Sequence, residues 1–160
     1  MKTKKLAELS LLTAAALIIF VVELRFPDIL PIPGVKPGLA NIITVYAVYK
    51  FSAGEAVMML TSRVVLGAIF STNLSALIYS ASGAAFCLIG MLLVRRIIPK
   101  RFIWLCSIIG AIFHNTGQIA AALLVTGTWA VLAYYPILIV AGTIAGLFTG
   151  ICAQFIICKI

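Results

Sequence analysis

The chain has 160 residues, 64% of them hydrophobic and only 10% charged, with a mean hydropathy of +1.22. Soluble domains carry about 25% charged residues, so this composition excludes an ordinary soluble protein. The net charge of +8 does not point to nucleic acid here, because the cations fall mainly between apolar segments. At roughly 20 residues per span, the length predicts one all-α domain of six transmembrane helices over residues 1–160.

The first apolar segment predicts a span at residues 5–24. We expect it to be retained, since no small-residue cleavage site precedes Glu23. Ser10, Ala14 and Ala15 give this span a stripe of small residues. Such a stripe either packs inside the bundle or docks a partner helix, and both readings stay open.

A proline-broken stretch at residues 34–46, GVKPGLANIITVY, leads into a second span predicted at residues 38–50. A helix that begins near Gly38 aims its free N–H groups at Lys36, which favours an anion there. Asn41 lies in the first turn. Lys36 is equally explained as an anchor at the membrane interface. The span is short, at about 20 Å of helix.

Four more spans are predicted at residues 53–70, 74–94, 102–125 and 129–158, with the basic connector RRIIPKR at residues 95–101. Six spans leave nine lysines and arginines outside the apolar segments on one side, and only Arg25 and Lys36 on the other. The positive-inside rule then places both termini in the cytoplasm and the protein in the cell membrane. Glu55 is expected to cap the third span.

Polar side chains inside the spans concentrate in the predicted outer half, as an outward-opening pocket would require. Arg63 needs an anion or several carbonyls, and Glu23 is its nearest candidate partner by depth. His114, Asn115 and Gln118 fall within about 6 Å of helix rise, and they form either a packing network or a pocket wall. The candidate ligand-binding residues are Lys36, Asn41, Arg63, Tyr79, His114, Asn115 and Gln118.

Gly142, Gly146 and Gly150 form a GxxxGxxxG series in the sixth span, which predicts close helix packing. The partner is either another span or a separate protein. The four cysteines have no CxxC spacing and the chain has one histidine, so we expect no metal, no cofactor and no disulfide framework.

Three stretches carry a family resemblance: GVKPGLANIITVYAVY (residues 34–49), EAVMMLTSRVVLGAIF (55–70) and GAIFHNTGQ (110–118). Together they resemble heptaprenyl diphosphate synthase component I, also called the Gx transporter family, over nearly the whole chain. The KPGLAN and HNTGQ elements are the most specific. Pro37 departs from the apolar residue expected after the lysine.

That family in turn resembles the substrate-capture components of energy-coupling factor transporters. The resemblance implies a ligand held near the outer face, with Lys36 and Asn41 at its rim and Arg63, His114, Asn115 and Gln118 around it. It also implies that the small-residue stripe of the first span docks a transmembrane coupling protein driven by two ATPases. Leu11 interrupts one register of that stripe.

Three functions follow as hypotheses. The first is a substrate-binding membrane component of a transporter for a small anionic or amphipathic molecule, since cations exceed carboxylates in the outer half. The second is a non-catalytic subunit of isoprenoid or menaquinone biosynthesis, with an apolar groove for a polyprenyl chain and the basic connector facing a diphosphate or a soluble prenyltransferase. The third is a scaffold in a larger membrane complex.

Two absences in the sequence limit the chemistry. Prenyl elongation needs several carboxylates to hold Mg²⁺ on the diphosphate, and Asp28 is the one aspartate of the chain. The sequence also has no GxxxxGK[ST] phosphate-binding motif. We therefore expect no catalysis by the chain alone and an external energy source for any ATP-driven transport.

Overall fold

The computed structural model describes residues 3–25, 38–70 and 74–159, and within these ranges it contains helices and no strand. The elements are α1 (Thr3–Arg25), α2 (Asn41–Lys50), α3 (Ala53–Phe70), α4 (Leu74–Val94), η1 (Lys100–Phe102), α5 (Ile103–Thr126), η2 (Trp129–Tyr134) and α6 (Tyr135–Lys159). The all-α fold is confirmed.

Five of the described helical segments are long and apolar enough to cross a membrane: α1, α3, α4, α5 with η1, and α6 with η2. The predicted second span is not among them, because α2 has only 10 residues, so the count of six spans stays a prediction. Such a helix is about 15 Å long, half the thickness of a bilayer core. Gly38 adopts a left-handed φ of 77°, so the chain turns before α2 begins.

The sixth predicted span, residues 129–158, coincides with the observed membrane-length segment Trp129–Cys158, which consists of two helices. Residues 129–134 form the 3-10 helix η2, and α6 begins only at Tyr135. Pro136 fits the first turn of α6, where its missing N–H breaks no helical hydrogen bond. The other predicted spans agree with the observed helices to within about two residues.

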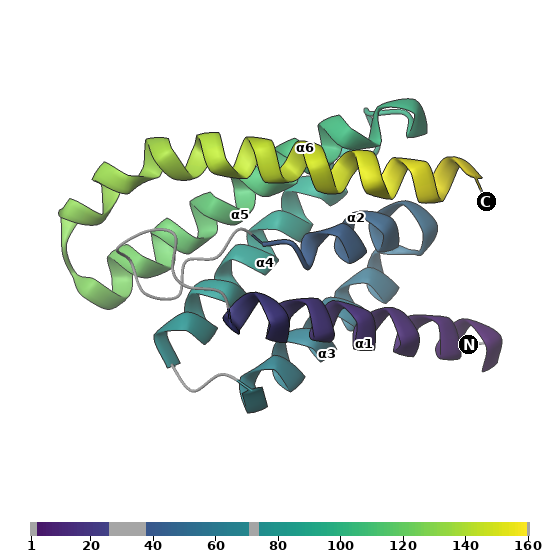
Figure 1. The fold of residues 1–160 in the computed structure, drawn as a ribbon, viewed down its shortest axis with the longest axis horizontal. Coiled ribbons are helices and arrows are strands. Elements are labelled where there is room, and N and C mark those ends of the chain that lie inside the picture. Colours follow the sequence, from purple (N-terminus) through teal and green to yellow (C-terminus); the bar gives the residue numbers. More distant parts are fainter. Residues whose placement is uncertain (1–2, 26–37, 71–73, 160) are drawn as a thin grey trace.

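The bundle is built around α5, which packs extensively against both α4 and α6, while α1 lies mainly against α3. Figure 1 shows α2 between α1 and α6, and it also contacts α3, α4 and α5. Six of the ten residues of α2 are buried. The start of α1 and the end of α6 lie at the same end of the bundle (Figure 1).

A side chain of α1 and a side chain of the α4–α5 connector hold the two ends of α2. At its start, the Glu23 carboxylate of α1 accepts hydrogen bonds from the N–H groups of Gly38, at 2.5 Å, and Leu39, at 3.1 Å. At its end, Arg95 donates to the carbonyls of Val48, at 2.6 Å, and Phe51, at 3.4 Å. An acid at the N-terminus and a cation at the C-terminus both oppose the helix dipole.

The glycine series of α6 packs against α5 of the same chain. A Cβ atom added at Gly142 would meet Asn115, one at Gly146 would meet Ala111, and one at Gly150 would lie 2.5 Å from the Cα atom of Trp104. Ser107 and Thr149 hydrogen-bond across the same interface at 3.0 Å. The question left open by the sequence is thus answered: the partner of this stripe is an internal helix.

Gly150→Ala is expected to lower the stability of the protein by about 1 to 3 kcal/mol, because the new methyl group meets the α5 backbone. The measurement is the thermal unfolding midpoint in one detergent. Gly54→Ala is the matched control, since a Cβ atom there has no neighbour within 4 Å. Equal midpoints for the two variants would contradict the close α5–α6 contact.

Candidate functional site

Six buried polar side chains from four helices gather in the interior of the bundle. We call them the polar cluster: Glu23, Asn41, Thr44, Arg63, His114 and Gln118, each at most 4% exposed. The Arg63 guanidinium of α3 and the Glu23 carboxylate of α1 attract each other, and His114 of α5 lies within the field of the same guanidinium. Polar side chains in a membrane bundle are costly unless they are satisfied internally, so this gathering is the first candidate site.

Gly38 and Gly83 allow the backbone to pack closely against the His114 side chain. A Cβ atom at Gly38 would lie 2.8 Å from Asn41 Nδ2 and 3.3 Å from His114 Nε2. A Cβ atom at Gly83 of α4 would lie 2.9 Å from both Gln118 Cγ and His114 Cε1. A larger residue at either position would push the imidazole aside, so these glycines define the tight enclosure of the cluster.

Four atoms of the polar cluster are buried without a hydrogen-bond partner among the described residues: Asn41 Oδ1, Thr44 Oγ1, His114 Nδ1 and Gln118 Oε1. Leaving such an atom unsatisfied costs about 1 to 3 kcal/mol, and native proteins usually satisfy it with protein, water or ligand. The two amide oxygens are acceptors, and the threonine hydroxyl and the imidazole nitrogen can each accept a hydrogen bond as well. The set fits a molecule that donates hydrogen bonds.

Arg63 is as fully buried as the rest of the polar cluster and lies over an aromatic ring. Its guanidinium carbon is 5.7 Å from the centre of the Phe20 ring. The narrow crevice beside it, lined also by Val64, Leu77 and Ser80, is too tight for water. Glu23, expected as its partner, accepts its close hydrogen bonds from Gly38 and Leu39, and it interacts with Arg63 through the longer-range attraction of their charges.

The other candidate binding residues lie apart from the polar cluster. Asn115 turns toward α6, where its Nδ2 donates to the carbonyl of Leu138 at 2.5 Å. Tyr79 is buried in a separate apolar cluster with Ile119 and Val131. Lys36 lies outside the described residues. The candidate binding residues predicted from the sequence did not include Thr44, Gly38 or Gly83. Of these three, only Gly38 carried a sequence signal for the site, because it precedes a helix that begins with a polar residue.

The small-residue stripe of α1 is only partly covered. Ser10 and Ala14 are exposed and Ala15 is half-buried, while α1 contacts the rest of the chain mainly through α3. Leu11 between them is 72% exposed. The stripe is therefore largely exposed rather than packed inside the bundle, and its docking role stays a prediction.

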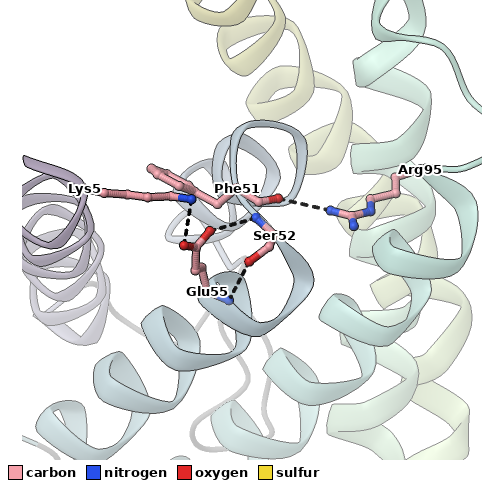
Figure 2. Close-up of polar contacts among 5 residues, drawn as sticks. All are labelled: Lys5, Phe51, Ser52, Glu55 and Arg95. Carbon is pink, nitrogen blue, oxygen red and sulfur yellow. Dashed lines mark hydrogen bonds and ion pairs between the residues drawn. The ribbon is translucent and has the colours of Figure 1, made fainter. Parts of the chain in front are cut away.

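A second candidate site lies where α1 begins and α6 ends, around the connector between α4 and α5. Figure 2 shows part of its framework: Lys5 pairs with Glu55 at 2.7 Å, and Arg95 reaches the carbonyl of Phe51. Ser52 and Glu55 exchange backbone hydrogen bonds in a capping box, so the expected capping role of Glu55 is confirmed. Lys50 pairs with Glu8 at 2.7 Å.

This end contains a half-open cavity of about 400 Å³, which we call the basic hollow. Its lining comes from α2 and from the connector: Val48, Tyr49, Arg95, Arg96, Ile97, Ile98, Pro99 and Lys100. A smaller hollow of about 200 Å³ adjoins it and shares Tyr49 and Lys100. Ligand sites commonly occupy 300 to 1,000 Å³, so the basic hollow is large enough for a small molecule.

The fold and these two sites define a small, multi-pass, all-helical membrane protein. The family model of heptaprenyl diphosphate synthase component I matches residues 12–156, and the chain belongs to this family. The resemblance found in the sequence is thereby confirmed. No curated protein and no solved structure matches the chain.

Glu23→Gln is expected to loosen the start of α2 by about 1 to 3 kcal/mol, because a neutral amide accepts weaker hydrogen bonds than a carboxylate. Hydrogen exchange should then quicken at the amides of Gly38 and Leu39. Glu8→Gln is the control, since its partly exposed pair with Lys50 contributes about 1 kcal/mol or less. Unchanged protection of Gly38 would show that Glu23 does not hold α2.

Proposed function

We propose that this protein is a non-catalytic membrane subunit that works with a heptaprenyl diphosphate synthase and holds the soluble enzyme at the membrane. The observation that carries the proposal is the basic end, where Arg96, Lys100 and Arg101 are exposed beside the basic hollow. The description of the family points to the same partnership.

The acidic residues of the chain indicate which part of the reaction the partner enzyme would perform. Chain elongation releases diphosphate from an allylic substrate, and Mg²⁺ held by several carboxylates stabilises that leaving group. The chain has only four acidic residues, and Glu8 and Glu55 are engaged in ion pairs with lysines. A partner enzyme must therefore supply the metal-binding carboxylates, while this subunit supplies the membrane.

The exposed cations suit an acidic surface on the partner. Charges at the rim of an interface mainly steer association and make it sensitive to salt. Arg95 is different, because it is committed to the end of α2. Under this proposal, Arg96, Lys100 and Arg101 form the docking surface, and it faces the cytoplasm, as the positive-inside rule predicts.

Co-purification tests this association. The triple variant Arg96→Gln, Lys100→Gln, Arg101→Gln should retain about tenfold less synthase than the wild type at physiological salt, and high salt should release the enzyme from the wild type. Arg25→Gln, a single exposed cation at the far end of α1, is the control. Retention of the synthase by the triple variant at the wild-type level would contradict the proposed docking surface.

A second candidate is the substrate-binding component of a transporter for a small anionic or amphipathic molecule. The unpaired atoms of the polar cluster favour it, since a ligand would satisfy them and Arg63 would attract a negative group. Such a component would borrow its energy from a coupling protein with two ATPases, docked on the exposed face of α1 that carries Ser10 and Ala14.

Native mass spectrometry of gently solubilised protein tests the second candidate. The wild type should retain a small molecule that His114→Ala and Gln118→Ala both lose, because each variant removes one wall of the polar cluster. Tyr79→Phe, which lies in the separate apolar cluster, should keep it. If the wild type carries no ligand, or if the Tyr79 variant loses it equally, the polar cluster serves packing alone.

A further inference from the structure

The basic hollow combines a positive wall with an apolar one. Arg95, Arg96 and Lys100 supply the charge, and Ile97 and Ile98 lie between them in the chain. Among the described residues, no carboxylate lines the basic hollow or its smaller neighbour, and the two acids at this end, Glu8 and Glu55, are paired with lysines. A positive cavity without internal acids is suited to an anion.

The cations are available to bind. Among the described residues, Arg96 and Lys100 form no ion pair or hydrogen bond, and both are exposed. Arg95 uses only its Nη1 group on Val48 and Phe51, so the remaining N–H groups of its guanidinium have no described partner. A guanidinium held in place in this way presents a fixed fork, the geometry that phosphate oxygens accept best.

The wall of the hollow is held in place by contacts across the sequence. Tyr49 of α2 donates its hydroxyl to the carbonyl of Ile98 at 3.4 Å, which joins α2 to the connector. Ile98 is buried in the main core, whereas Ile97 is 82% exposed. An exposed isoleucine beside three cations leaves an apolar path that leads out of the hollow.

We propose that the basic hollow binds the phosphate or diphosphate head group of a membrane amphiphile, with its hydrocarbon chain following Ile97 toward the lipid. Arg95, Arg96 and Lys100 hold the head group, in keeping with the tendency of basic pockets at the membrane surface to bind phosphorylated head groups. Resting on the function proposed above, the amphiphile is an isoprenoid diphosphate, so the subunit delivers or retains a substrate or product of its enzyme.

Binding of labelled farnesyl diphosphate to the purified protein in an uncharged detergent tests this site. The double variant Arg96→Gln, Lys100→Gln should bind at least tenfold more weakly, and both positions are exposed, so the fold is kept. Arg101→Gln is the matched control, because this neighbouring cation lies over Phe102 and does not line the hollow. An equal loss in the control would reduce the effect to net charge and overturn the site.

Competitors identify the source of the head group. Unlabelled farnesyl diphosphate should displace the probe best, inorganic diphosphate should need a higher concentration, and farnesol should fail. Displacement by phosphatidylglycerol at the same concentration as farnesyl diphosphate would overturn the isoprenoid assignment. Since the assay contains no synthase, its failure leaves the co-purification result intact, and a failed co-purification leaves this binding result intact.

Discussion

The structure depends on how the ends of the short helix α2 are satisfied in the middle of a membrane bundle. A helix of 10 residues leaves unpaired N–H groups at its start and carbonyls at its end, and within lipid no bulk water can satisfy them. Glu23 of α1 accepts hydrogen bonds from Gly38 and Leu39 in the turn that leads into α2, and Arg95 after α4 donates to carbonyls at its end. These two capping residues are far apart in sequence, so α2 is defined only once the other helices have assembled around it.

Each cap of α2 stands at the edge of one candidate site. Glu23 belongs to the polar cluster with Arg63 and His114, where buried atoms lack partners within the described chain. Arg95 forms part of the wall of the basic hollow. Both ends of α2 require a charged partner in a medium of low dielectric. One of these partners lies in the enclosed polar cluster and the other in the half-open basic hollow.

The two sites suit different ligands. The polar cluster is enclosed and mixes donors with acceptors, while the basic hollow is half-open and its charged side chains are donors. Under the proposed function, the partner enzyme supplies the carboxylates that hold Mg²⁺, and this subunit offers cations and apolar surface to the phosphorylated, lipophilic substrates. Membership of the component I family is in accord with this division.

The sequence alone determined the features that depend on composition and local period: a helical membrane protein, the approximate ends of its long helices, the Glu55 cap and the close packing at Gly142, Gly146 and Gly150. Tertiary structure decided the rest. His114 and Asn115 are adjacent in sequence but about 100° apart around the helix, and only the positions of α2 and α6 decided that one joins the polar cluster and the other binds Leu138. The basic hollow likewise needs α2 and a connector some 50 residues later, a pairing that no local pattern encodes.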